Sequence, residues 1–207
     1  MMKLVIHTNL DALLPFGKLI LTAALGLPAA LLISSALVAA LGKLPPLPFL
    51  HKTARFLPLP FSLCNSTACI PATLSFCGEK LGLREDFVKF SIPVGMQLNM
   101  DGTAFYVAIT SMMLARTFHL AQDAYFFAAF FFAQFFLALT GIGFIAMPSM
   151  FVAFGIPEVA IATVIGIEPI LDMCGTAQSV LGNITSSLLV GRRLGQVDEK
   201  TYGSADT

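Results

Sequence analysis

Apolar residues along this chain come in long runs that are separated by short polar or proline-rich segments. The first run, from Leu13 to Leu41, contains Lys18 as its one charged residue. At 1.5 Å per residue, a helix of this length spans about 43 Å, which is enough for a tilted membrane crossing. Lys18 lies near one end, where a lysine can extend its ammonium group to the interface. The pattern predicts a transmembrane helix over 11–42, after an N-terminal segment 1–10.

The next apolar pieces are too short to cross a membrane. Prolines interrupt Phe49–Pro71, and Pro71–Leu83 is brief, so each continuous piece is below the roughly 20 residues that a span needs. The two halves flank the polar tip Asn65–Thr67. We therefore predict a re-entrant helical hairpin over 47–89.

A second re-entrant hairpin is predicted over 122–156. A phenylalanine-rich stretch, 124–139, meets the polar turn Thr140–Gly143, and another short apolar piece follows. Irregular backbone at membrane depth is tolerated only where protein or water satisfies its polar groups. Two hairpins whose tips meet near mid-depth are a known way to build a gated transport site.

Two longer apolar stretches contain polar side chains in their middle. The stretch 90–120 carries Gln97, Asn99 and Asp101, and 158–190 carries Glu168 and Asp172. Both are predicted to be transmembrane helices. The polar tail 191–207 is expected to be frayed.

Composition narrows the class of protein. Of the 207 residues, 57% are hydrophobic and 12% are charged, whereas a soluble domain carries about 25% charged residues. A soluble domain and a disordered chain are both excluded. The 12 basic and 12 acidic residues cancel, so no basic face for nucleic acid is expected. The four cysteines form no CxxC pair, which argues against a zinc site or a redox motif. The fold class expected is an all-α membrane protein with two opposed re-entrant hairpins.

The placement of basic residues predicts the orientation in the membrane. Cytoplasmic loops are enriched in Lys and Arg, and such residues flank the first hairpin and follow the last helix. They are Lys43, Lys52, Arg55, Lys80, Arg84, Lys89, Arg192 and Arg193. The first hairpin should therefore enter from the cytoplasm and the second from outside, with the C-terminus in the cytoplasm.

Five polar residues lie on one face of the last helix. Their spacings are four, four, three and four residues, and they are Glu168, Asp172, Thr176, Ser179 and Asn183. A carboxylate at the bilayer centre is costly, so this stripe should face a cavity or another helix rather than lipid. The alternatives are polar contacts between helices, or a place at the interface for Glu168.

The run Gln97–Thr103 favours a cation site. Consecutive polar residues point in several directions on a regular helix, and Gly102 lowers helix stability by about 1 kcal/mol relative to alanine. Local unwinding would free backbone carbonyls beside Asn99 and Asp101. Hard oxygen donors around a carboxylate suit a small cation such as Na⁺. No catalytic constellation and no cofactor motif stands out, so an enzyme is not expected.

Three motifs carry a resemblance to a known family. SIPVGMQLNMDGT (Ser91–Thr103), FSLCNSTACIP (Phe61–Pro71) and IEPILDMCGTAQSVLGN (Ile167–Asn183) resemble motifs of the dicarboxylate/amino acid:cation symporters, the glutamate-transporter homologues. The resemblance runs from about Leu10 to Gly195. It implies the C-terminal half of a transport domain that works by an elevator form of alternating access.

The resemblance also implies roles for single residues. Ser66 would contact the substrate carboxylate, and Asp172 would hold the substrate amino group. The substrate would also contact Thr103, Gly175, Thr176 and Ser179. Cation binding would fall to Asn99, Met100, Asp101 and Asn183, with Na⁺ at Asn99 and Asp101. The extracellular gate would lie around Thr140, Gly141 and Gly143.

The chain departs from the family pattern at four positions. Gly175 stands where members that take acidic amino acids have an arginine, so a neutral substrate is favoured. Ser179 replaces an asparagine. Asn183 replaces an aspartate that binds sodium, which keeps H⁺ open as the coupling ion. Gly143 replaces the usual tip proline.

Family members are about twice this length. The sequence therefore predicts the C-terminal half of a symporter for a small amino acid or carboxylate in the inner (plasma) membrane. A separate chain would supply the N-terminal helices, and the complete protein would be a homotrimer. The alternatives are a truncated remnant, a split subunit without transport of its own, or a channel or structural subunit.

Overall fold

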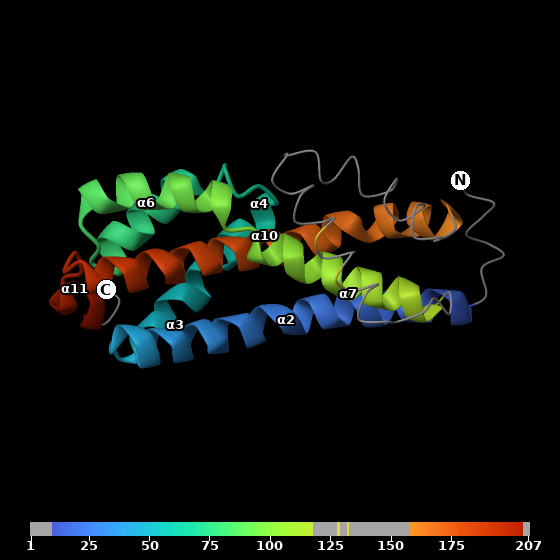
Figure 1. Cartoon of the computed structure of the whole chain (residues 1–207), viewed down its shortest axis with the longest axis horizontal. Coiled ribbons are helices and arrows are strands. Elements are labelled where there is room, and N and C mark those ends of the chain that lie inside the picture. Colours follow the sequence, from blue (N-terminus) through green and yellow to red (C-terminus); the bar gives the residue numbers. More distant parts are fainter. Residues whose placement is uncertain (1–9, 118–127, 129–131, 133–157, 205–207) are drawn as a thin grey trace. The chain divides into compact units, whose positions relative to one another are not determined.

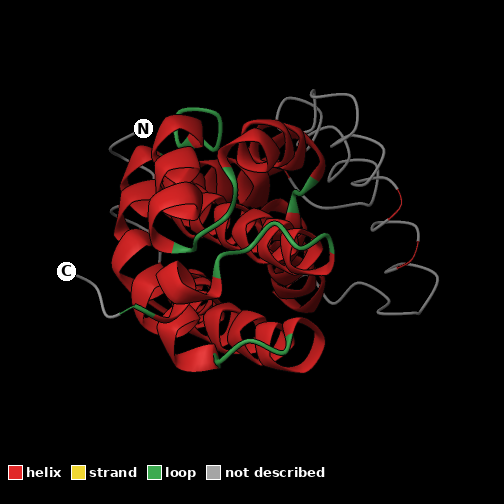
Figure 2. Ribbon diagram, turned by 90° about the vertical axis from the view of Figure 1, so that its left-hand side faces the viewer, coloured by secondary structure: helices red, strands yellow, loops and turns green. Residues whose placement is uncertain are grey.

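A computed structural model describes residues 10–117, 128, 132 and 158–204. These residues form helices joined by short loops, with one isolated antiparallel bridge between Leu83 and Val197 (Figures 1 and 2). The elements in chain order are α2 (Leu10–Gly42), α3 (Pro46–Phe56), α4 (Pro58–Leu63), α5 (Ile70–Ser75), the π-helix η1 (Phe76–Lys80), α6 (Glu85–Leu98), α7 (Asp101–Thr117), α10 (Glu158–Arg193) and α11 (Glu199–Gly203). The all-α class is confirmed for this part of the chain.

The chain divides into two compact units. One comprises Met1–Ala24 and Ala104–Leu171, and the other comprises Leu25–Thr103 and Asp172–Thr207. In the first unit, the buried side chains that the structure describes include those of Leu19, Tyr106 and Thr110. The second unit holds the hairpin tip, the α6–α7 break and the polar part of α10. The candidate site is therefore built within the second unit.

Helix α2 is long and apolar, as its sequence predicts. Its segment Phe16–Gly42 is, among the described residues, the one helix whose length and composition fit a membrane crossing. Leucines along it are strongly exposed, with Leu25 and Leu32 each at 61%. The helix ends where Lys43 takes a left-handed conformation (φ 52°) and the Leu44 amide donates to the Val38 carbonyl at 3.4 Å.

The predicted first hairpin is a helical hairpin in the structure. Prolines begin both α3 and α4, where the missing N–H costs nothing. Cys64 leaves α4 in a left-handed conformation (φ 49°), and a turn leads into α5 and η1. The arms are antiparallel: the rings of Phe56 and Phe76 stack with centroids 4.4 Å apart, and the Lys52 ammonium bonds the Lys80 carbonyl at 2.7 Å.

The stretch predicted as one unwound helix is two helices. Helix α6 starts at Glu85, five residues earlier than expected, and ends at Leu98. Asn99 is extended (φ −93°, ψ 95°), and α7 begins at Asp101. The interruption lies inside the polar run in which unwinding was expected.

Helix α10 forms the centre of the second unit. Leu181, Ile184 and Leu188 are buried on one side, and Ser179 and Asn183 are buried on another. The core of this unit gathers around it from α2, the hairpin, α6 and the tail. Its members include Val38, Phe49, Cys77, Leu81, Val88, Ile92, Val180, Leu181, Ile184 and Tyr202.

The expectation of a frayed tail is wrong up to Ser204. Helix α11 follows the cap residue Asp198, and Tyr202 is 1% exposed. Burial raises the pKa of Tyr202 to about 12, so its phenol stays protonated and donates to the Pro45 carbonyl at 2.8 Å. One buried aromatic residue outweighs the polar composition of the segment, because burying a ring stabilises more than a few polar contacts. The second predicted hairpin, 122–156, lies outside the described residues apart from Ala128 and Phe132.

Candidate functional site

The α6–α7 break lies against the middle of α10 at a point of close backbone approach. A Cβ atom at Gly102 would clash with the backbone of Gly175. The Gly102 amide donates to the buried Ser179 hydroxyl at 3.1 Å. This amide is one of the first N–H groups of α7, which have no partner within their own helix. Ser179 therefore caps the start of α7 from another helix.

Asn99 and Asp101 converge over a second glycine of α10. A Cβ atom at Gly182 would clash with a carboxylate oxygen of Asp101 and lie 2.5 Å from the amide nitrogen of Asn99. The two side chains therefore meet at the same small surface of α10. The Asn99 amide nitrogen is buried and has no hydrogen-bond partner among the described residues. Buried polar groups without a partner are rare in folded proteins.

Asn183 links α10 to α6, and on α10 it lies one helical turn after Ser179. Its amide nitrogen donates to the Ile92 carbonyl at 3.0 Å, and its side chain fills the space beside Gly95. Pro93 lies next to this carbonyl inside α6. The sequence placed Asn183 among the cation-binding residues, and this interhelical bond was not predicted. No spacing in the sequence pairs Asn183 with this carbonyl of another helix.

Asp172 and Thr176 form the outer part of the polar stripe. The Thr176 hydroxyl lies 3.5 Å from a carboxylate oxygen of Asp172, one helical turn away. Thr176 is buried and Asp172 is half-buried. The carboxylate is thus shielded on one side and open on another, which suits the binding of an ammonium group. Glu168, which is half-buried, belongs to the other unit.

The hairpin tip presents an unused hydroxyl. The tip is held by its own backbone: the Ala68 amide bonds the Asn65 side chain at 3.1 Å, and the Cys69 amide bonds the Ser66 carbonyl at 3.1 Å. The half-buried Ser66 side chain makes no hydrogen bond with any described residue. Helix α5 packs along α6 and the chain reverses at 81–84, so the tip and the break lie toward the same end of this pair (Figure 1).

The remaining predicted residues divide into two groups. Met100 is half-buried in the break, and Thr103 is half-buried in the first turn of α7. Thr140, Gly141 and Gly143 lie outside the described residues. Among the residues described, no three His, Cys, Asp or Glu side chains gather as metal ligands. The candidate cation site at Asn99 and Asp101 has one carboxylate, one amide and backbone carbonyls, so it is not such a cluster of three metal ligands.

Comparison with known proteins decides the family. Residues 1–193 match the Sodium:dicarboxylate symporter family. The chain belongs to this family. The family is described as one of sodium:dicarboxylate symporters, a family of transporters rather than of enzymes.

Several curated relatives within the sodium:dicarboxylate symporters are similar to this chain. An L-cystine uptake protein of Bacillus cereus is 28% identical over the whole chain, which covers 46% of that relative. A proton/sodium-glutamate symport protein of Bacillus caldotenax is 26% identical over 69% of the chain and 35% of its own length. A C4-dicarboxylate transport protein of Mesorhizobium japonicum is 27% identical over 68% of the chain and 33% of its own length. The chain therefore spans about half the length or less of these relatives.

Proposed function

We propose that the chain is the C-terminal, substrate-binding half of a cation-coupled symporter for a small, net-neutral amino acid or carboxylate. One observation carries the proposal. The α6–α7 break brings Asn99 and Asp101 over Gly182, beside the bond from the Gly102 amide to Ser179. An interrupted helix that faces a polar stripe is the arrangement in which transporters bind ions and substrates.

The cation is proposed to bind at Asn99 and Asp101. The helix ends at Leu98, so its last carbonyls, beyond that of Gly95, which accepts from the Asn99 amide at 2.7 Å, have no intrahelical partner, and Asp101 adds a negative charge. Carboxylate, amide and carbonyl oxygens are hard donors that suit Na⁺. Met100 would contribute its backbone. H⁺ stays an alternative coupling ion, because Asn183 stands where the resemblance implies an aspartate that binds sodium, and it cannot provide that carboxylate.

The substrate is proposed to bind between the hairpin tip and α10. Asp172 would hold its ammonium group, and Thr176 would line the same place. The unused Ser66 hydroxyl would donate to its carboxylate. Gly175 provides no cation for an acidic side chain, which favours a neutral substrate. The relative matched over the whole chain is named for L-cystine, an amino acid without net charge.

The wider architecture follows as part of the same proposal. The hairpin of α3–η1 would enter the membrane from the cytoplasm and return to it, and a second hairpin within 122–156 would form the outer gate. The domain would move as an elevator in the plasma membrane, in a homotrimer, with the C-terminus in the cytoplasm. The exposed leucines of α2 are consistent with a lipid-facing helix.

Uptake assays on cells that express the full chain test the proposal. Labelled neutral and acidic amino acids are supplied with Na⁺ or with choline in its place. We expect Na⁺-dependent uptake of a neutral amino acid, and we expect Asp172→Asn to abolish it because the ammonium group loses its counter-charge. Asp86→Asn is the matched control, since that carboxylate is 88% exposed on α6.

The other outcomes identify the rival functions. Unchanged uptake in Asp172→Asn would contradict the role of that carboxylate. Absence of uptake under every condition would favour a remnant or a split subunit, which the half length of the chain makes the main rival. An ion current without substrate would favour a channel.

A further inference from the structure

A buried lysine lies at the base of the first hairpin, away from the proposed substrate site. Lys52 is 4% exposed. Its ammonium group donates to three backbone carbonyls: Lys80 at 2.7 Å, Thr201 at 3.0 Å and Tyr202 at 3.0 Å. A lysine ammonium has three donors. A buried lysine is tolerated only when such bonds offset its desolvation.

The three acceptors are carbonyls at helix C-termini. Lys80 ends η1, and Thr201 and Tyr202 lie at the end of α11. The last carbonyls of a helix have no partner within it, and a cation is a favourable partner for them. Lys52, on the first arm of the hairpin, therefore closes the end of the second arm and the end of the tail helix at once.

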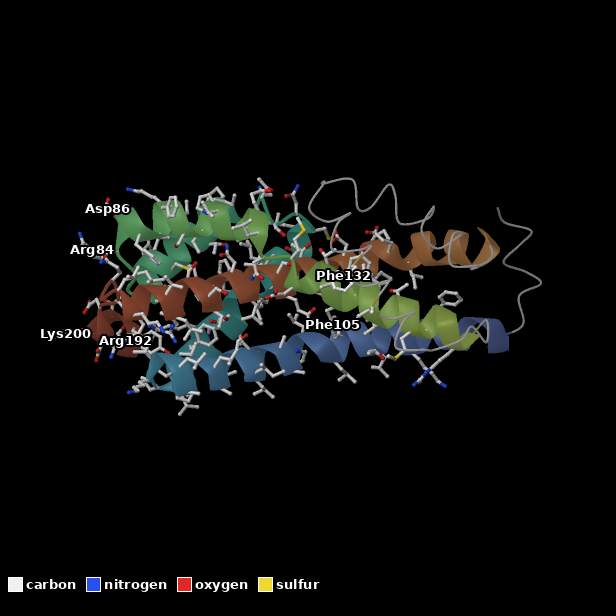
Figure 3. The ribbon with its side chains drawn as sticks, in the orientation of Figure 1. Arg84, Asp86, Phe105, Phe132, Arg192 and Lys200 are labelled. Carbon is white, nitrogen blue, oxygen red and sulfur yellow. The ribbon has the colours of Figure 1, made fainter. Side chains whose placement is uncertain are left out.

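Other bonds hold the tail at the same place, independently of Lys52. We call residues 196–203 the C-terminal clasp. The Arg84 amide bonds the Gln196 carbonyl at 3.0 Å, the Asp198 amide bonds the Gly82 carbonyl at 2.8 Å, and the Tyr202 phenol bonds the Pro45 carbonyl. Arg192 pairs with Glu199 and donates to the Gly42 carbonyl at 3.3 Å. Figure 3 shows Arg192 close to Lys200 of α11 at this end of the unit.

The clasp is connected to the hairpin tip through rigid contacts. The stacked rings of Phe56 and Phe76 lie between the base and the tip. The element η1 is a π-helix, a conformation that is rare overall but is often found at functional sites when it occurs. The tip residues bond mainly to one another. The place of the Ser66 hydroxyl is therefore set by how the two arms are held at their base.

We propose that Lys52 is a positioning residue that, together with the C-terminal clasp, fixes the base of the first hairpin and thereby holds its tip in the substrate-binding position. The hairpin then moves with α10 as one body, and it is the base, rather than the tip, that controls its opening. The link to substrate binding rests on the proposed function, whereas the link between clasp and hairpin does not.

Native cysteines test the mechanical part without any transport assay. Cys77 in η1 is fully buried, and its carbonyl accepts from the Leu83 amide at 3.0 Å, close to the base of the hairpin. We expect Lys52→Gln to raise the rate of maleimide labelling at Cys77 at least about tenfold, because losing even one of its three charge-assisted hydrogen bonds changes an opening equilibrium by that factor. Mass spectrometry of the full chain in detergent reads each cysteine separately.

Matched variants separate the clasp from general unfolding. Lys200→Gln removes an exposed lysine of α11 whose side chain makes none of the bonds named for the clasp, and it should leave Cys77 protected. Cys174, which is 4% exposed in α10, should stay protected in every variant. Tyr202→Phe deletes only the bond to Pro45 and serves if Lys52→Gln does not fold. Cys77 protection that is equal to wild type in both Lys52→Gln and Tyr202→Phe would overturn the proposal.

Kinetics test the positioning role. Lys52→Gln should raise the KM for substrate several-fold at an unchanged maximal rate per folded molecule, because the tip is misplaced while the rest of the site is intact. Deleting residues 197–207 should have the same effect, and combining the two should add little, since both act through one clasp. An unchanged KM with less folded protein would show a merely structural role. If the wild-type chain shows no uptake, the proposed function is refuted. The labelling of Cys77 then still tests whether Lys52 and the clasp fix the base of the hairpin.

Discussion

At the residue scale, the site depends on the absence of side chains as much as on their chemistry. Gly102 and Gly182 let the α6–α7 break lie directly on α10, so that the Asn99 and Asp101 side chains and the Gly102 amide reach that helix. A Cβ atom at either glycine would push the break so far from α10 that its polar groups could not form hydrogen bonds with that helix. The glycines therefore set the distance at which the polar groups act.

Gly102→Ala is expected to disrupt the site by steric conflict. The added Cβ would meet the backbone of Gly175, which cannot rotate away as a side chain can. Overpacking of this kind costs about 1–3 kcal/mol of the free energy of unfolding. Thermal unfolding in detergent measures the loss. Gly166→Ala is the control, because nothing lies within 4 Å of its Cβ position, and equal melting temperatures in the two variants would contradict the close approach.

Gly175→Arg should change which substrates compete for uptake. An arginine beside Asp172 and Thr176 would provide a guanidinium that pairs with a carboxylate side chain through two hydrogen bonds. We expect aspartate and glutamate to become competitors of the labelled neutral amino acid. Competition assays on wild type and variant measure this, and Gly175→Ala controls for the loss of space. Absence of any gain for acidic amino acids would show that the missing cation does not set the preference.

The sequence alone predicts which residues belong to the candidate site better than it predicts which groups they bond. Asn99, Asp101 and the stripe on α10 follow from polar residues in apolar runs, because an ionisable group in a membrane helix needs a reason to be there. The bond from Asn183 to the Ile92 carbonyl and that from the Gly102 amide to Ser179 do not follow, since each depends on the register between two distant helices. Spacing within one helix contains no information on that register.

At the element scale, the short tail helix shows where sequence pattern fails. Residues 191–207 are polar, and nothing in their composition indicates that Tyr202 is buried. Its binding place is made by Pro45, Lys52 and Gly82, which lie more than a hundred residues earlier in the chain. The long helix α2, in contrast, is predicted almost to its ends, because apolar length alone defines it.

The cap of α11 should make the tail sensitive to acid. Bonds from the Thr201 hydroxyl at 2.6 Å and the Lys200 amide at 3.2 Å lower the pKa of Asp198. Its folded pKa is thus below the unfolded value of about 3.9. This stabilisation is complete above the unfolded pKa and is lost as the pH falls through the folded pKa.

Asp198→Asn isolates this contribution. The asparagine oxygen still caps the helix but does not titrate. We expect the difference in melting temperature between wild type and variant to be constant from pH 7 to about 5 and to shrink below about 4. Asp86→Asn, an exposed carboxylate outside the tail, is the control for general acid effects. A difference that is independent of pH throughout would show that the cap bonds do not depend on the charge of Asp198.

At the scale of the whole molecule, the chain spans about half the length of the Bacillus cereus relative, and it contains the residues that we propose to bind substrate and cation. The second unit, which contains α3 to α6 and the end of α10, has a core and a polar site of its own. The resemblance implies that the other half of the relatives supplies most of a scaffold. The site and the scaffold against which it moves are thus expected to be separable.

Joining the chain to the other half of a relative is expected to restore transport. A chimera would consist of the N-terminal half of the Bacillus cereus relative followed by this chain, which matches 46% of that protein over the chain's full length. Elevator transport needs a fixed scaffold, so we expect more Na⁺-dependent uptake by the chimera than by the chain alone. Asp172→Asn in the chimera should abolish uptake, which assigns the activity to this chain's site.

Two controls make the comparison decisive. The N-terminal half expressed alone should give no uptake, and the chimera should be extracted as a folded oligomer of the same size as the relative. Equal uptake by the isolated chain and by the chimera would show that 207 residues transport without a scaffold. A folded chimera that binds but does not transport would instead show that this half recognises substrate and has lost the fit to a scaffold. In that case the Gly175→Arg and Lys52→Gln variants would still alter binding, because both act within the second unit.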